Sequence, residues 1–179
     1  FSDGGKFNNK VKSFEHISKM VKSGAMIIDI GGESTRPGSK SISFNTELKR
    51  VGNVLKSFKK KHKKICLSLD TRKSEIMKYG LSNGVDLLND VSGFNYDRNS
   101  LKFIKKNNIS KVLHHMKGTP NTMQIKPNYE NVLLDIYDFF EDSIKNKFSD
   151  RNIILDPGIG FGKTLKHNLT LISKVSLFH

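Results

Sequence analysis

The chain has 179 residues, enough for one domain with a hydrophobic core, so we expect residues 1–179 to form a single domain. Its composition, 36% hydrophobic and 27% charged, excludes disordered and fibrous proteins. No apolar run approaches the roughly 18 residues of a membrane span, and we find no targeting segment. The single Cys66 cannot form an intramolecular disulfide. These features predict a cytoplasmic location and no membrane partner.

The net charge of +14 raises the alternative of a basic nucleic-acid-binding protein. The excess comes from lysines scattered over predicted helix faces. The one dense run, Lys59–Lys64, has no interleaved aromatic residues to stack on bases. We therefore expect a solvated turn at this run and no nucleic-acid partner.

Apolar runs of strand length alternate with helical patterns along the chain. In chain order the sequence predicts a helix over 11–21, a strand over Ala25–Ile30, a helix over 48–58 with Thr46 as candidate N-cap, a strand over Ile65–Leu69, a helix over 76–81, strands over Val85–Leu88 and Lys111–His114, a helix over 129–148, a strand over Asn152–Leu155 and a helix over 169–178.

This alternation predicts a parallel sheet, either open and doubly wound or closed as a barrel. Each predicted strand is followed by a polar or glycine-rich loop, which favours the barrel, because a barrel gathers all such loops at one end. A closed barrel of this type has eight strands and typically ~250 residues. The expected fold is therefore α/β, an incomplete (β/α)8 TIM barrel holding about strands two to six, with residues 1–7 as the tail of a first loop.

Polar residues stand at the predicted strand ends. In the strand before Asp70 the period of two places Cys66, Ser68 and Asp70 on one face, so Asp70 is expected to point into the mouth of the barrel. The alternative is that Asp70 only caps the following helix. Asn89 ends the next strand, and Asp156 brings another carboxylate to the same end. Carboxylates and amides suit a flat heterocycle with adjacent N–H and C=O groups.

Other segments carry weaker signals. Gly31 and Gly32, followed by Ser34-Thr35-Arg36, suit a phosphate or diphosphate, or serve turn formation alone. His114 and His115 are adjacent on a strand and should point to opposite faces, so they cannot both bind one metal ion while the strand stays straight.

Taken together, the loops resemble the dihydropteroate synthase family of folate-pathway enzymes over the whole chain. The motifs that carry the resemblance are Phe1-Ser2-Asp3-Gly4-Gly5, the run from Ile28 to Gly38, Ser68-Leu69-Asp70-Thr71, Asn89-Asp90, the run from Met116 to Met123, and the run from Asp156 to Lys163.

The resemblance implies condensation of 6-hydroxymethyl-7,8-dihydropterin diphosphate with p-aminobenzoate, without a side-chain nucleophile and with Mg²⁺ assisting the departure of diphosphate. It implies a pterin pocket at Asp70, Asn89 and Asp156. It further implies that Thr35, Arg36 and Pro37 hold the diphosphate and p-aminobenzoate, and that Phe161 lines the p-aminobenzoate side.

The family's metal-contacting Asn would lie upstream of Phe1, so no metal ligand is expected in this chain. The family's Ser-Arg-Lys and Arg-x-His motifs would follow His179. We therefore expect residues 1–179 alone neither to close a barrel nor to catalyse, and the parent protein to be a homodimer. A pterin-binding domain that transfers a methyl group from a folate to a corrinoid is the alternative within the superfamily.

Overall fold

The structure is a computed structural model that describes residues 10–148 and 152–178. Their elements in chain order are α1 (Lys10–Lys22), β1 (Ile27–Gly31), α2 (Phe44–Lys61), β2 (Cys66–Asp70), α3 (Ser74–Leu81), β3 (Leu87–Asp90), α4 (Arg98–Asn107), β4 (Ser110–His114), α5 (Val132–Lys147), β5 (Ile153–Asp156), α6 (Leu165–Ser173) and a short 3-10 helix, η1 (Val175–Phe178). The prediction for residues 1–7 lies outside the described residues.

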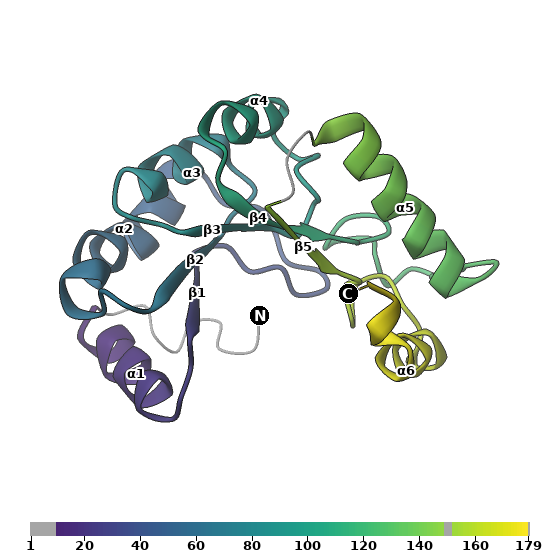
Figure 1. The fold of residues 1–179 in the computed structure, drawn as a ribbon, viewed down its shortest axis with the longest axis horizontal. Coiled ribbons are helices and arrows are strands. Elements are labelled where there is room, and N and C mark those ends of the chain that lie inside the picture. Colours follow the sequence, from purple (N-terminus) through teal and green to yellow (C-terminus); the bar gives the residue numbers. More distant parts are fainter. Residues whose placement is uncertain (1–9, 149–151, 179) are drawn as a thin grey trace.

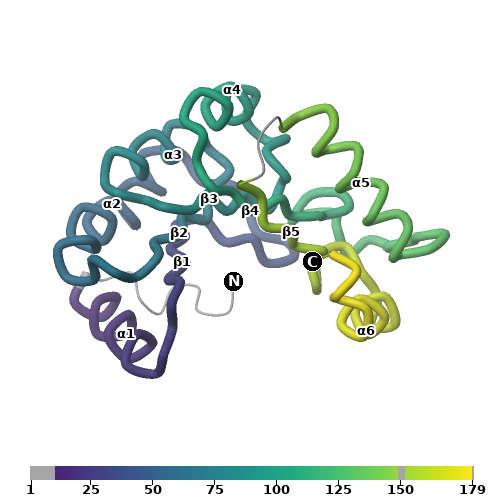
Figure 2. Tube along the Cα trace, in the orientation of Figure 1, coloured from purple at the N-terminus to yellow at the C-terminus, as the bar shows by residue number. Residues whose placement is uncertain are grey.

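The strands form one parallel sheet in the order β1-β2-β3-β4-β5. The order never reverses, as it would in a doubly wound sheet. The helices lie along the outer side of a curved sheet, and the inner side carries none of them (Figure 1). The tube view makes the arc plain, with β1 and β5 at its two ends (Figure 2). This is the progression of a TIM barrel, left open between β1 and β5 within the described residues.

The core lies between the sheet and its helices. Leu67 and Leu69 alternate along β2 and are completely buried against helical residues such as Leu55 and Ile76. The opposite face of the same strand carries Ser68 and Asp70, because successive side chains of a strand point to opposite sides. Period two therefore divides β2 between a helix-covered apolar face and an inner, more polar one.

Two sequence predictions need correction at helix ends, and one helix was not predicted. The N-cap of α2 is Ser43 rather than Thr46, whose backbone N–H donates to the Ser43 hydroxyl (3.3 Å). Helix α6 begins at Leu165, four residues before the predicted start, behind a capping box formed by Thr164 and His167. Helix α4 was not predicted, because its ten residues hold only three apolar ones, Leu101, Phe103 and Ile104, of which Ile104 alone is fully buried.

The lysine-rich run ends α2 and enters the turn before β2. Lys60, Lys61, Lys63 and Lys64 are exposed, as expected of a solvated turn. Lys59 instead reaches the Asp86 carboxylate and the Ile65 carbonyl oxygen. Over the ranges that the structure describes, no helix combines the length and the apolar character needed to cross a bilayer.

Candidate functional site

The carboxyl ends of the strands bring a set of polar side chains to the inner face of the sheet. Each lies next in sequence to an aliphatic residue that packs under the helices, so the strand period turns it inward. The members are Asp29 (β1), Asp70 (β2), Asn89 (β3), His114 (β4) and Asp156 (β5). We call these five residues the inner polar set. Asp70, Asn89 and Asp156 were predicted, whereas Asp29 and His114 were not.

Asp70 and Asn89 are register partners on neighbouring strands. Gly31 pairs with Asp70 from the other side, and a β-carbon at Gly31 would lie 3.1 Å from Asp70 Oδ2. The glycine thus leaves room for the carboxylate. Burial raises the pKa of Asp70 well above its usual range, and the negative charges of Asp29 and Asp90 raise it further. The Asp70 carboxyl therefore lies in a buried environment next to other carboxylates.

The alternative role for Asp70, a helix cap, is wrong. Helix α3 has Lys73 at its N-cap position with no side-chain cap bond. The Ser74 N–H donates instead to Asp97 Oδ2 (2.8 Å), from the segment that follows β3. Asp70 is thus not needed by the helix.

Asn89 is also incompletely satisfied. Its amide nitrogen donates to Asp29 Oδ2 (3.2 Å), while its amide oxygen is buried and has no hydrogen-bond partner among the described residues. A buried acceptor without a donor costs free energy, so the Asn89 amide oxygen is open to a donor from outside the described residues. Asp90 points the other way and accepts from the backbone and hydroxyl of Ser92, and burial raises its pKa to about 6. Asp90 therefore shapes the turn after β3.

His114 lies next to both Asp156 and Phe161. Its Nε2 lies 3.9 Å from Asp156 Oδ2, and its ring meets the Phe161 ring edge-on at 4.6 Å between centroids. Nδ1 lies 3.0 Å from the Val91 carbonyl oxygen, which can only accept, so Nδ1 carries the hydrogen. Burial lowers the pKa of His114, against the pull of Asp156, so the ring is neutral and Nε2 is an acceptor. Two acceptors, Nε2 and Asp156, thus stand side by side.

His115 points to the opposite face, as predicted. Its ring packs edge-on against Phe139 of α5, and its Nδ1 lies 3.1 Å from Lys163 Nζ. Lys163 is 3% exposed and also donates to the Phe161 carbonyl oxygen (2.9 Å). Burial lowers the pKa of Lys163 to about 8. Lys163 thus binds the loop that carries Phe161, on the same side of the sheet as His115.

The Thr35-Arg36-Pro37 segment forms the tip of the loop after β1. Thr35 is buried, whereas Arg36 and Pro37 are exposed. The Gly38 N–H donates to the Pro120 carbonyl oxygen (3.0 Å), so this tip touches the loop after β4. The tip lies on a different loop from Asp70, Asn89 and Asp156.

Gly32 allows the loop after β1 to pack closely against α2. A β-carbon there would come within 2.9 Å of the Glu47 and Val51 side chains of α2. Its carbonyl oxygen accepts from Arg50 (2.8 Å). Close approach to α2, rather than a phosphate, is thus reason enough for glycine at this position.

Residues 10–148 and 152–178 contain no group of three His, Cys, Asp or Glu side chains arranged to hold a metal ion. The acidic members of the inner polar set come from three strands, β1, β2 and β5; Asp29 accepts from Asn89, and Asp156 lies 3.9 Å from His114 Nε2. The set is therefore better suited to N–H donors of an organic ligand than to a bare cation.

Comparisons with known proteins agree with this geometry. The chain is 34% identical over 183 residues to dihydropteroate synthase of Escherichia coli, an alignment that covers 100% of the chain and 64% of the relative. The dihydropteroate synthase of Yersinia pestis, solved with a sulfonamide drug, superimposes with a TM-score of 0.94 at 36% identity, over 99% of this chain and 65% of that one.

A second solved structure, the Xanthomonas albilineans dihydropteroate synthase with 4-aminobenzoic acid, gives a TM-score of 0.85 at 30% identity, over 99% of this chain and 64% of that one. The chain thus spans somewhat less than two thirds of each relative. The model of the family described as pterin binding enzyme matches residues 1–179. The chain therefore belongs to the pterin binding enzyme family.

Proposed function

We propose that the protein containing this chain is a dihydropteroate synthase, which joins 6-hydroxymethyl-7,8-dihydropterin diphosphate to p-aminobenzoate and releases diphosphate. The observation that carries the proposal is the inner polar set, whose acceptors outnumber its donors at the mouth of a partial barrel. Relatives of this name match essentially the whole chain, and one was solved with 4-aminobenzoic acid.

The pterin ring carries hydrogen-bond donors, which the inner polar set has in short supply. Its 2-amino group and ring N–H groups are donors, and its ring nitrogens and carbonyl oxygen are acceptors. Asp70 and the Asn89 amide oxygen would take hydrogen bonds from one part of the ring. Asp156 and His114 Nε2 would take them from another. Such bonds favour the ionised carboxylates and remove the cost of an unpartnered buried acceptor.

The reaction breaks the C–O bond between the pterin methylene and the diphosphate and forms a C–N bond to the arylamine, which loses a proton. Positive charge develops on the pterin as the diphosphate departs. The carboxylates of Asp70 and Asp156 would stabilise this charge, and Arg36 would face the negative charge of the diphosphate. Phe161, held edge-on against His114, would line the arylamine side.

Mg²⁺ enters the proposal only as an ion carried by the diphosphate. No step is assigned to it, because the described residues contain no group of three His, Cys, Asp or Glu side chains arranged to hold a metal ion. A cytoplasmic homodimer that acts on small molecules, without nucleic acid, completes the proposal.

A turnover assay tests the proposed function. The full-length protein, given both substrates, should form 7,8-dihydropteroate and diphosphate in equal amounts. Formation should require both substrates, and a sulfonamide should compete with p-aminobenzoate. Absence of product, together with methyl transfer from a methylated folate to a corrinoid, would replace this proposal with the methyltransferase alternative.

A further inference from the structure

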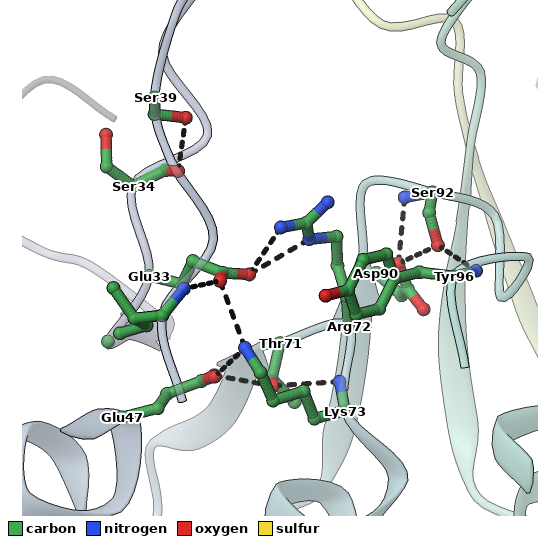
Figure 3. Close-up of polar contacts among 12 residues, drawn as sticks. Glu33, Ser34, Ser39, Glu47, Thr71, Arg72, Lys73, Asp90, Ser92 and Tyr96 are labelled. Atoms are coloured by element: carbon green, nitrogen blue, oxygen red, sulfur yellow. Dashed lines mark hydrogen bonds and ion pairs between the residues drawn. The ribbon is translucent and has the colours of Figure 1, made fainter. Parts of the chain in front are cut away.

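A buried network of charged side chains joins the loop after β1 to the loop after β2. Glu33 lies at the start of the first loop, Arg72 and Lys73 follow Asp70 in the second, and Glu47 comes from α2 (Figure 3). The Glu33 and Glu47 side chains are 3% and 0% exposed. Buried charges of this kind are costly unless every one is paired, and here each has a partner of opposite charge.

Glu33 is the centre of this network. Its Oε2 accepts two charge-assisted hydrogen bonds from Arg72, from Nε (3.0 Å) and Nη2 (2.6 Å), which converge on this one oxygen. Its Oε1 accepts from Lys73 Nζ (3.0 Å) and from the Ile42 N–H (2.8 Å). Burial alone would raise the pKa of Glu33, but these bonds outweigh it and hold the pKa below its usual value.

The bond to Ile42 gives Glu33 a geometric consequence. Glu33 and Ile42 stand at the two ends of the loop after β1, so one carboxylate closes that loop at its neck. Within the loop, the Ser39 hydroxyl donates to the Ser34 carbonyl oxygen (2.7 Å). Glu33 therefore joins the two ends of the loop that carries the exposed tip with Arg36 and Pro37. Arg72, from the next loop, binds Glu33.

Arg72 is itself fixed on both sides. Its guanidinium lies over the ring of Tyr96, 4.2 Å from the ring centroid, in the segment after β3. It stands in the loop after β2, two positions beyond Asp70, the last residue of that strand. A shift of the Glu33–Arg72 pair would therefore move the Arg36 tip relative to Asp70.

We propose that Glu33 and Arg72 are positioning residues that set the distance between the pterin side and the arylamine side of the site, without contacting either substrate. The inference rests on the proposed function and deepens it. Loss of the pair should weaken use of the arylamine while leaving the pterin side intact, since the hydrogen bonds of Glu33 and Arg72 go to the network and to Ile42 rather than to the pterin-side residues.

The experiment compares Glu33→Gln and Arg72→Lys with Asp86→Asn in the full-length protein. Asp86 is the control residue. Its carboxylate also binds a lysine, Lys59, and accepts from a backbone N–H, that of Leu67, but Asp86 follows α3 rather than a strand. The measurements are the KM for p-aminobenzoate, the Kd for 6-hydroxymethyl-7,8-dihydropterin, which lacks the diphosphate, and the thermal midpoint.

The expected result is an increase of about tenfold or more in the p-aminobenzoate KM for Glu33→Gln, and a smaller increase for Arg72→Lys, which keeps the charge but cannot place two N–H donors in the guanidinium geometry. The pterin Kd should stay within about twofold in both variants, and Asp86→Asn should change neither constant. The thermal midpoint shows which variants are folded under the assay conditions.

An unchanged p-aminobenzoate KM in folded Glu33→Gln and Arg72→Lys overturns the inference, as does an equal loss in both substrate constants, which would mean a merely structural pair. If Glu33→Gln does not fold, Arg72→Lys alone decides. Absence of product from the unmodified protein is a different result, because it rejects the proposed function and the inference with it.

Discussion

A β-carbon on Gly158 would lie 1.9 Å from the carbonyl oxygen of His115. The loop after β5 thus passes directly over the end of β4, and Gly158 also has a φ of +70°, which favours glycine. Gly160, two residues further on, has a φ of +83°, but a β-carbon there would meet no atom of the described residues within 4 Å. Gly158 thus combines a close approach to another backbone atom with a positive φ, whereas Gly160 has the positive φ alone.

Gly158→Ala should therefore destabilise the protein far more than Gly160→Ala. We expect about 3 kcal/mol or more for the first, from the clash and the strained φ together, and about 1–2 kcal/mol for the second, from φ alone. Urea denaturation of both variants measures the difference. Equal losses would mean that the loop moves away from His115 at little cost.

Asp70→Ala should weaken binding of the pterin substrate by about a hundredfold, because it removes a carboxylate that the ligand would pair with. Lys61→Ala is the control, since Lys61 lies over the Phe14 ring, 4.5 Å from its centroid, on the helical side of the molecule. Calorimetric titration of the full-length protein with the pterin measures both. Equal effects of the two substitutions would refute the pocket assignment.

His114→Phe should keep the edge-on ring contact with Phe161 but remove both ring nitrogens. We expect pterin affinity to fall by about tenfold, the loss of one hydrogen bond to a buried acceptor. The loss should be smaller for an analogue that lacks the 2-amino group, because that analogue cannot donate to Nε2 and Asp156 together. The same loss for both ligands would mean that His114 only packs against them.

His115 predicts how stability depends on pH. Burial, together with the positive charge of Lys163, lowers the pKa of His115 to about 3 in the folded protein. The unfolded chain binds this proton near pH ~6.5, so between about pH 6.5 and 3 it holds more protons than the folded one. The contribution of His115 to stability is therefore complete above about pH 6.5 and is lost as the pH falls toward about 3.

His115→Gln, which cannot titrate but keeps an acceptor for Lys163, should flatten this dependence. Between about pH 6.5 and 4.5 its free energy of unfolding should fall less steeply than that of the unmodified protein, by on the order of 1 kcal/mol per pH unit. Denaturation at several pH values gives the two slopes. Identical slopes would show that His115 does not stay neutral in the folded state.

Local patterns were enough to predict the strands and the direction of their side chains. Period two turned Asp70 inward and placed His114 and His115 on opposite faces, because both facts follow from one stretch of backbone. The pairing of Glu33 with Arg72 was beyond such reasoning, since it joins loops that are far apart in sequence. The same holds for His114 and Asp156, whose contact depends on the register of β4 and β5.

The unpaired outer edges of β1 and β5, at the two ends of the described sheet, have a practical consequence. An edge strand exposes N–H and C=O groups at the spacing that an incoming strand needs. Ile27 and Ile154, on the inner face of these two strands, are each 50% exposed. The described sheet therefore favours edge-to-edge association between copies of the chain.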